Sequence, residues 1–169
     1  GAVVSVVVGI TLTLPISSAA ICMMLGLDGL AAGAATVGCC ANMIGFAVIS
    51  YRENGFGGLM AQGIGTSMLQ MPNILRNPRI WIPSIAASAV LGPVSTMIFK
   101  MENIPIGAGM GTCGLVGQVG TIAAMGEGSE VYMAILLLHF ILPALISLFV
   151  AGVLRKWGWI RPGDMKLDL

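Results

Sequence analysis

The sequence predicts an all-α integral membrane protein with about four transmembrane helices and two glycine-rich segments that are either re-entrant or interfacial. Of the 169 residues, 57% are hydrophobic and only 9% are charged, and the mean hydropathy is +0.96. Soluble domains carry about 25% charged residues, so much of this surface must face something other than water. Long uncharged runs separate the few charges and have the length of membrane spans. The lipid bilayer is therefore the first predicted partner.

Four apolar stretches are long enough to cross a bilayer, which takes about 20 helical residues. They cover residues 3–25, 29–51, 80–99 and 131–154. In the first, Pro15 and the Ser17-Ser18 pair predict a kink near the middle. The second begins with GLAAG, a small-xxx-small face that allows another helix to approach closely. Gly92-Pro93 interrupts the third span and Pro143 the fourth.

Basic residues gather at one end of these spans and acidic residues at the other. The basic set is Arg52, Arg76, Arg79, Arg155, Lys156, Arg161 and Lys166, and the acidic set is Asp28, Glu127 and Glu130. The positive-inside rule then predicts that both termini, the connection 52–79 and a tail over 155–169 lie in the cytoplasm. Trp81, Trp157 and Trp159 mark the same span ends, where amphipathic rings prefer to be. Lys100 is an exception, with Glu102 beside it as a local partner.

Composition excludes several functions. A net charge of +1 provides no cluster of Lys and Arg for nucleic acid. The cysteines Cys22, Cys39, Cys40 and Cys113 contain no CxxC pair and have no clustered histidine, so we interpret them as small buried hydrophobic residues and predict no metal site. No Ser/His/Asp set, carboxylate pair or phosphate-binding GK[ST] occurs, and neither a cofactor nor catalysis is predicted.

The glycine-rich segment 57–75 has an amphipathic helical pattern. At 100° per residue, Gln62, Thr66, Gln70 and Asn73 share one stripe, and Met60, Ile64, Met68, Met71 and Leu75 share the opposite one. One interpretation is an interfacial helix on the cytoplasmic leaflet. However, its four glycines disfavour a helix interior, and its polar face carries amides instead of Lys and Arg. An uncharged amide face favours the alternative, a stripe that lines a protein-enclosed aqueous cavity.

The second segment, 103–124, contains Gly109-Met110-Gly111-Thr112-Cys113-Gly114, which matches the dinucleotide pattern GxGxxG. That motif requires a preceding strand, and KMENIPI contains a proline and no strand alternation, so a nucleotide site is rejected. Two readings of the glycines remain, close helix packing and a re-entrant backbone around a polar site.

The two segments share a short frame. Gly58-Leu59-x-x-Gln62 recurs as Gly114-Leu115-x-x-Gln118, and each copy precedes a span that contains a proline. Glycine is common here, so coincidence is the alternative. If the repeat is real, the chain contains two units of glycine-rich hairpin plus span, and such paired interrupted segments point to a transporter's central site.

A polar uncharged solute would bind through amides, hydroxyls and unwound backbone. His139 is the single histidine, deep in the fourth span and four residues before Pro143; it is either a solute or proton-relay residue or a structural donor to a carbonyl freed by a kink. Asn42 is interpreted as a residue that joins two helices by a side-chain hydrogen bond. The candidate substrate-binding residues are Gln62, Thr66, Gln70, Asn73, Thr112, Gln118, Thr121 and His139.

The blocks NGFGGLMAQGIGTSMLQMPNILRNPRIWIP (54–83) and FKMENIPIGAGMGTCGLVGQVGT (99–121) resemble the EIIC-like membrane proteins of the phosphotransferase system. The closer resemblance is to a sugar-transporter IIC subgroup that includes a PfoR-type regulator of toxin expression. It covers the chain from about Gly33 onward. Because members are longer and the chain opens at Gly1 without a methionine, we expect a C-terminal half.

This resemblance implies a multi-pass protein of the bacterial cytoplasmic membrane, a homodimer, with re-entrant hairpins around a sugar site and a phosphorylating IIB partner. The better-known sugar-transporting groups carry an acidic residue in a hairpin motif, and here Gln62 and Gln118 are amides. Two hypotheses follow: a permease that binds and translocates a sugar, or a membrane sensor or regulator that keeps the fold without transport. A structural helix-packing subunit is the third class.

Overall fold

One buried helix organises the chain, and the other helices pack around it. The structure is a computed structural model that describes residues 1–168. Helices account for nearly all regular structure in these residues, and their single β-bridge joins Gly29 to Asn103. In chain order the elements are α1 (Ala2–Thr13), α2 (Ser18–Met24), α3 (Gly29–Ile49), α4 (Tyr51–Met60), η1 (Ala61–Gly65), η2 (Ser67–Gln70), α5 (Met71–Arg76), η3 (Pro78–Trp81), α6 (Ile82–Pro93), η4 (Val94–Phe99), α7 (Pro105–Ala108), η5 (Cys113–Leu115), α8 (Val116–Met125), α9 (Ser129–Ile135), η6 (Leu136–Ile141) and α10 (Leu142–Lys156).

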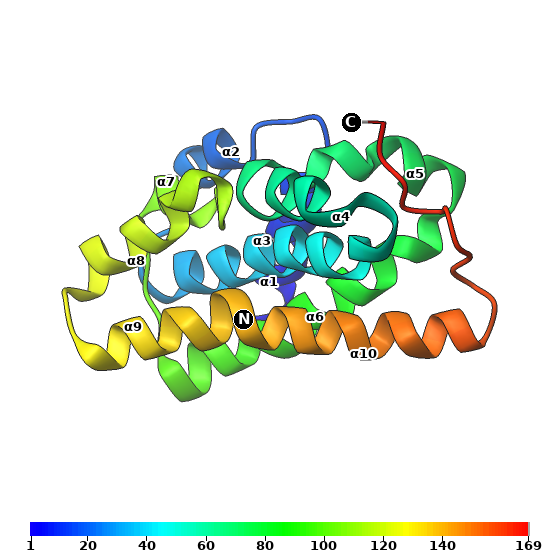
Figure 1. The fold of residues 1–169 in the computed structure, drawn as a ribbon. Coiled ribbons are helices and arrows are strands. Elements are labelled where there is room, and N and C mark those ends of the chain that lie inside the picture. The colour runs from blue at the N-terminus through cyan, green and yellow to red at the C-terminus, as the bar shows by residue number, and fades with distance from the viewer. Residues whose placement is uncertain (169) are drawn as a thin grey trace.

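Three helices are long and apolar enough to cross a membrane. They are α3, the continuous run Pro78–Phe99 (η3, α6 and η4) and the continuous run Ser129–Lys156 (α9, η6 and α10). Figure 1 shows the third as the long orange rod beside α3. Their positions agree with three of the four predicted apolar stretches to within about two residues. The predicted fold class, an all-α membrane protein, is confirmed.

The predicted helix over 3–25 is two helices instead of one kinked helix. Leu14, which precedes Pro15, is extended, with φ −69° and ψ 155°, as sterics before proline favour. Ser17 then starts α2, because its side chain accepts a hydrogen bond from the N–H of Ala20. With 12 residues, α1 is about 18 Å long and too short to cross a hydrocarbon core of about 30 Å.

Glycines let backbones pack directly against α3. A Cβ atom on Gly38 would lie 1.9 Å from the Ser5 carbonyl oxygen of α1, and one on Gly33 would lie 1.9 Å from that of Met101. A Cβ on Gly45 would lie 2.6 Å from the Ser84 hydroxyl of α6. Small residues therefore set the spacing of the bundle. In the predicted GLAAG face, Gly33 makes a close approach, whereas Gly29 has open space and a φ of +57°.

The two glycine-rich segments form helical hairpins. The first runs up through α4 and η1, turns at Thr66 and returns through η2 and α5; the second is α7, η5 and α8. In Figure 1 they lie on the same side of α3 and come from opposite ends of the molecule. The amphipathic helical pattern over 57–75 is interrupted at Thr66, which is extended, with φ −158°.

In the first hairpin the polar stripe faces the interior of the bundle and the apolar stripe faces its surface. This is the reverse of the arrangement in a soluble protein. Gln62, Gln70 and Asn73 are buried, while Leu75 is 76% exposed. The other exposed members of the apolar stripe are Met60, Ile64 and Met68. Apolar side chains therefore point outward, as lipid contact requires, and the amides point inward. This orientation argues against a helix that lies flat at the interface with its apolar face in lipid and its polar face in water.

The repeated frame does not have one conformation. Gly58 is buried in the helical arm of the first hairpin, whereas Gly114 and Leu115 both have positive φ, 54° and 60°, in the turn of the second. Each hairpin is nevertheless followed in the chain by a long helix, Pro78–Phe99 after the first and Ser129–Lys156 after the second. The letter match between the two glycine-rich segments therefore does not reflect equivalent backbone positions.

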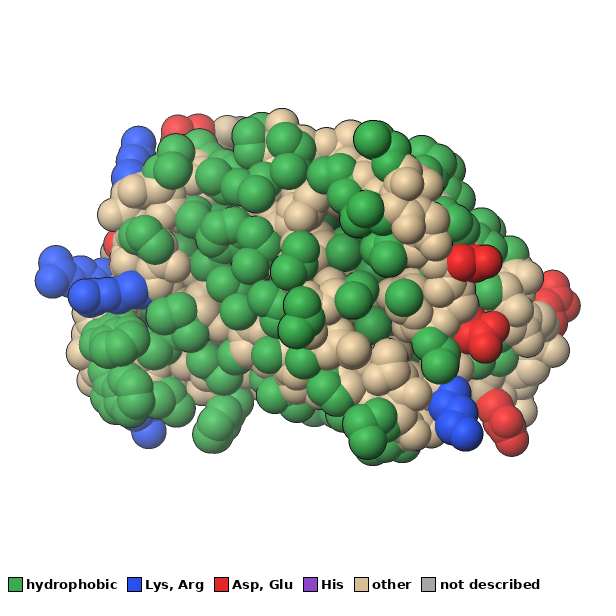
Figure 2. Space-filling view, turned by 180° about the vertical axis from the view of Figure 1, so that it is seen from behind, with side chains coloured by type: hydrophobic (Ala, Val, Ile, Leu, Met, Phe, Trp, Pro, Cys, Tyr) green, Lys and Arg blue, Asp and Glu red, His purple; other side chains and the backbone are tan. Residues whose placement is uncertain are grey.

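Charges separate between the two ends of the bundle. Figure 2 shows most Lys and Arg side chains at one end and most Asp and Glu side chains at the other, with a largely hydrophobic band between them. The basic end includes the last turn of α10 with Arg155 and Lys156. The acidic end includes Glu130 in the first turn of α9. This segregation along the helix axes is the pattern from which the orientation was predicted.

Replacing Gly38 with Ala should strongly destabilise the bundle, because the added methyl meets the backbone of α1, which cannot move aside without separating the helices. We expect a loss of about 1–3 kcal/mol or more, seen as a lower melting temperature of the detergent-solubilised protein. Gly152→Ala is the control, because Gly152 is helical in α10 with open space around its Cβ position. The control should be neutral or stabilising, and equal melting of the two variants would contradict this packing.

Candidate functional site

The ends of the two hairpins meet beside the middle of α3. The hydroxyl of Thr112, in the turn of the second hairpin, donates a hydrogen bond to the carbonyl of Gly63 in the first. Gly63 belongs to the π-helical turn η1, in which Thr66 N–H bonds five residues back to the carbonyl of Ala61. Non-α backbone leaves carbonyls free for other partners. Thr112 uses one of them to join the two hairpins.

Gln118 and His139 form a buried polar pair next to this junction. Gln118 Nε2 lies 3.0 Å from His139 Nδ1 and 3.5 Å from the sulfur of Cys40. His139 has no exposed surface, and Gln118 is 7% exposed. With the amide donating, Nδ1 is the acceptor of the ring and the proton is on Nε2. This hydrogen bond joins the second hairpin to the long C-terminal helix.

Two atoms of this pair have no hydrogen-bond partner in residues 1–168. They are Gln118 Oε1, an acceptor, and His139 Nε2, which is the donor of the ring in this tautomer. Buried polar atoms are normally paired, and each orphan costs about 1–3 kcal/mol. Each of these atoms could pair with a hydroxyl group, which both donates and accepts hydrogen bonds.

The sequence explains why His139 lies in an irregular turn. Pro143 has no N–H to donate to the carbonyl of His139, four residues earlier. The chain forms the π turn η6 immediately before it, and Leu142 N–H bonds back to Leu137. Such π turns are frequent at functional sites. The predicted disturbance at Pro143 is therefore a widened turn that includes His139.

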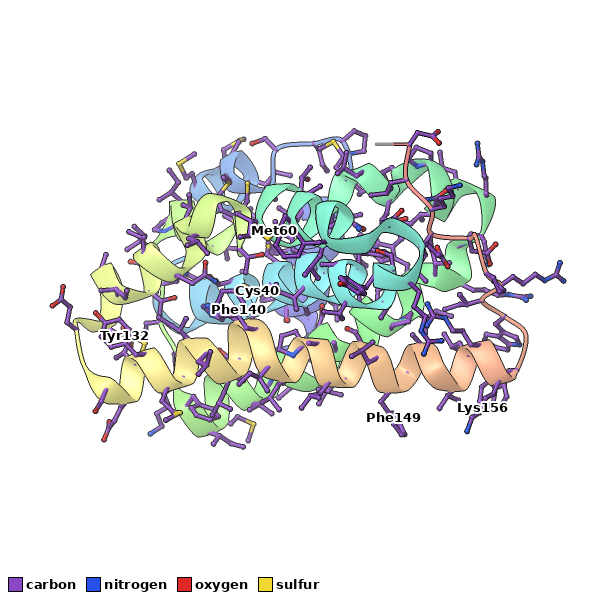
Figure 3. All side chains as sticks on the ribbon, in the orientation of Figure 1. Cys40, Met60, Tyr132, Phe140, Phe149 and Lys156 are labelled. Atoms are coloured by element: carbon purple, nitrogen blue, oxygen red, sulfur yellow. The ribbon has the colours of Figure 1, made fainter. Side chains whose placement is uncertain are left out.

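The hairpin junction and the Gln118–His139 pair are close together because both contact the same part of α3. Thr112 Oγ1 lies 3.5 Å from the sulfur of Met43, and Gln118 contacts Cys40, one turn earlier. Figure 3 draws Cys40 near the middle of the molecule, between the α4 hairpin above and the α9–α10 rod below. Gly111 permits this approach, since its φ is +54° and a Cβ there would lie 2.7 Å from that of Cys39. The junction is thus at mid-length of the bundle.

A separate network fixes the base of the second hairpin. Asn103 Nδ2 donates to the hydroxyls of Thr36 (2.6 Å) and Thr121 (3.2 Å) and to the carbonyl of Gly117 (3.0 Å). Its Oδ1 accepts from Ile104 N–H. Sequence reasoning did not single out Asn103, although an Asn two residues before Pro105 in an apolar chain is a signal for a turn. Thr121 therefore bonds within the protein, away from the unpaired atoms.

The amides of the first hairpin form a ladder with the C-terminal tail. Gln70 Nε2 donates to Gln62 Oε1 (2.7 Å) and to the Met165 carbonyl (3.0 Å), and Asn73 Nδ2 donates to Gln70 Oε1 (2.9 Å) and to the Lys166 carbonyl (2.9 Å). Gln62 Nε2 donates to Ser50 and to the carbonyl of Gly58. These side chains are therefore occupied by protein partners.

The predicted site residues thus fall into separate groups. Thr112, Gln118 and His139 come together at the hairpin junction. Gln62, Gln70 and Asn73 form the ladder, Thr121 belongs to the Asn103 network, and Thr66 caps the η2 turn by accepting from Met68 N–H. Asn42, interpreted as a residue that joins two helices, accepts from the indole N–H of Trp81 at 2.9 Å. Within residues 1–168 no group of three His, Cys, Asp or Glu side chains could hold a metal ion.

The GxGxxG stretch has no nucleotide-binding geometry. It follows the helical turn α7 and forms the turn into η5 and α8, whereas the dinucleotide motif links a strand to a helix. The family model described as "Phosphotransferase system, EIIC" matches residues 1–167.

The chain belongs to the phosphotransferase system EIIC family. The match includes residues 1–32, which precede the part on which the sequence resemblance rests. The curated proteins and the solved structures contain no significant match to this chain. This EIIC-family chain is a transporter-type membrane subunit, as both the family and the three apolar helices indicate.

Replacing Gln70 with Leu should loosen the tail of this EIIC chain. The change removes the donor to Met165 and leaves Gln62 Oε1 and Asn73 Nδ2 each without one partner, so we expect a local loss of about 1–3 kcal/mol. Hydrogen exchange of the amides at 163–167 should speed up. Gln118→Leu is the matched control, because Gln118 makes no contact with the ladder. Equal exchange in wild type and Gln70→Leu would contradict a structural role for the ladder.

Proposed function

We propose that this chain is the permease part of a sugar phosphotransferase system and that it binds a polar uncharged solute, a sugar, at the hairpin junction. The observation that carries the proposal is the pair of unpartnered atoms on Gln118 and His139. Sugar hydroxyls would satisfy both atoms without bringing a charge into the bundle. Thr112 would add a third polar group, and its bond to Gly63 would couple solute binding to the contact between the hairpins.

The location of the pair is the one expected of a transporter site. Cys40, which Gln118 contacts, is near the middle of α3, and His139 is within the 28-residue run Ser129–Lys156. Both hairpins end at this level, and irregular backbone at membrane depth is tolerated where it lines a polar site within the protein. We propose that the hairpins are re-entrant. Val119, the neighbour of Gln118, is 64% exposed, so a small displacement of α8 would give a solute access.

We also propose an orientation in the membrane, a partner protein and an oligomeric state for this subunit. The basic end would face the cytoplasm of a bacterium, with the C-terminal tail on that side, and would there meet a IIB phosphorylation partner. A homodimer is the proposed assembly. Gln62, Thr66, Gln70, Asn73 and Thr121 would support the hairpins as solute binds; their present partners are within the protein.

The alternative is an EIIC-like sensor or regulator that binds solute without passing it. It is favoured by the chemistry of the junction, because the buried polar residues of 1–168 include no Asp or Glu. A sensor would need the binding site and a responsive tail, and the amide ladder joins the tail to the first hairpin. Sugar uptake into vesicles that contain the protein separates the two: binding without uptake supports the sensor.

Replacing His139 with Phe should abolish solute binding, because the side chain stays an aromatic ring and loses the unpaired Nε2 donor. The measurement is the rise in melting temperature with a panel of neutral mono- and disaccharides, since a ligand stabilises by RT ln(1 + [L]/Kd). Wild type should respond to at least one sugar and His139→Phe to none. His139→Gln, whose amide nitrogen can reach the position of Nε2, is the second variant and should keep part of the response. An unchanged response of His139→Phe would reduce His139 to a packing residue.

A further inference from the structure

A polar pocket lies at the basic end of the bundle, and none of the hairpin-junction residues lines it. It is a pocket of about 280 Å³ between the turn that joins α5 to η3 and the start of the C-terminal tail. Three arginines line it, Arg76, Arg79 and Arg161, together with Trp159 and Asp164. Two segments more than 75 residues apart in sequence therefore bring guanidinium groups to one small volume.

The pocket carries an excess of positive charge. Asp164 is the single carboxylate in its lining, and its Oδ2 already accepts from Asn77 Nδ2 at 2.7 Å and from the backbone N–H of Arg161 at 2.8 Å. Three arginines thus line a pocket whose one carboxylate already accepts from other donors. Guanidinium forks match the paired oxygens of a phosphate group, so the lining is complementary to a phosphate-bearing anion.

The walls of the pocket are held in place. The guanidinium of Arg79 lies over the Trp159 ring, 5.1 Å from its centroid, and Asn77 Nδ2 donates to the Trp159 carbonyl at 3.0 Å. Trp157 packs edge-on against Trp159, with 5.7 Å between the ring centroids. A cation stacked on an indole has fewer accessible positions, so part of the cost of ordering the arginine on binding is met before the ligand arrives.

The pocket lies where a membrane lipid can reach it. The long helix ends at Lys156, and the tail residues Trp157 and Trp159 follow, 65% and 40% exposed. Leu75, which precedes the lining residue Arg76 in the chain, is 76% exposed. Tryptophans prefer the boundary between hydrocarbon and headgroups, which places a basic pocket next to exposed apolar side chains at headgroup level. Basic pockets between transmembrane helices on the cytoplasmic side bind anionic headgroups.

We propose that Arg76, Arg79 and Arg161 form a binding site for the phosphate group of an anionic ligand, and that the ligand is the headgroup of an anionic phospholipid. Its phosphate would sit among the three guanidinium groups, and its acyl chains would lie against Leu75, Trp157 and the exposed face of α10. The bound lipid would join the α5–η3 turn to the tail. This site is separate from the solute site at Gln118 and His139 and does not depend on it.

The test compares two double variants of the full chain that remove the same charge from the same end. R76Q/R161Q changes the pocket, and R52Q/K156Q changes basic residues outside its lining. Each protein is purified in a neutral detergent, and its melting temperature and lipid retention by native mass spectrometry are measured with added phosphatidylglycerol or phosphatidylcholine. A second arm uses inorganic phosphate alone.

Wild type should bind phosphatidylglycerol in preference to phosphatidylcholine, R76Q/R161Q should bind it at least about tenfold more weakly, and R52Q/K156Q should remain close to wild type. Equal losses in the two double variants, or no lipid preference in wild type, would overturn the site. If inorganic phosphate but not phosphatidylglycerol stabilises wild type, a phosphate site remains and the lipid source is wrong. Should the glutamine variants unfold, R76K/R161K keeps the charge without the fork and should bind with intermediate affinity.

Discussion

The need to satisfy backbone polar groups inside an apolar bundle controls this structure. Hairpins that turn at mid-length of the helices leave N–H and C=O groups without α-helical partners, and inside a bilayer such groups need partners from the protein or from a water-filled cavity. The protein supplies partners from its own side chains: Thr112 for Gly63, Asn103 for Gly117 and for Ile104. Each of these polar residues is buried and contacts backbone. Without them the glycine-rich segments would have to become continuous helices or leave the bundle.

The same requirement explains why the solute site and the structural polar residues are hard to tell apart by composition. Amides in an apolar chain serve equally well as ligands for a solute and as caps for broken helices. The difference lies in saturation. The amide nitrogens of Gln62, Gln70 and Asn73 in the ladder all donate to protein partners, whereas Gln118 and His139 each keep one unpaired atom. Four other buried atoms in residues 1–168 are also unpaired, the hydroxyls of Ser5, Ser84, Ser95 and Ser147. The candidate site is therefore identified by two unpaired atoms on side chains that bond each other beside the hairpin junction.

Much of the fold follows from the sequence, because long apolar runs and charge segregation depend on local composition. The positions of α3 and of the two long helices that follow, and the distribution of charge between the two ends, were all predictable on that basis. The sequence predicted only a kink at Pro15. The structure has two separate helices there, because Ser17 caps the start of a new helix. The absence of charge on the amide stripe favoured its inward direction, but its partners could not be predicted, because Met165 and Lys166 lie about 95 residues away in the chain. The backbone conformation of the glycines could not be predicted either. Gly58 and Gly114 occupy the same position in the repeated sequence pattern, but Gly58 is helical and Gly114 has a positive φ.

The most direct test of the account is an experimental structure of the protein with a neutral sugar that stabilises it. We expect sugar density at the hairpin junction, with hydroxyl oxygens at hydrogen-bond distance, about 2.7–3.2 Å, from Gln118 Oε1 and His139 Nε2, and with both hairpin turns enclosed at the middle of the membrane. Sugar bound elsewhere, with Gln118 and His139 still unpaired or bonded only to protein, would contradict it.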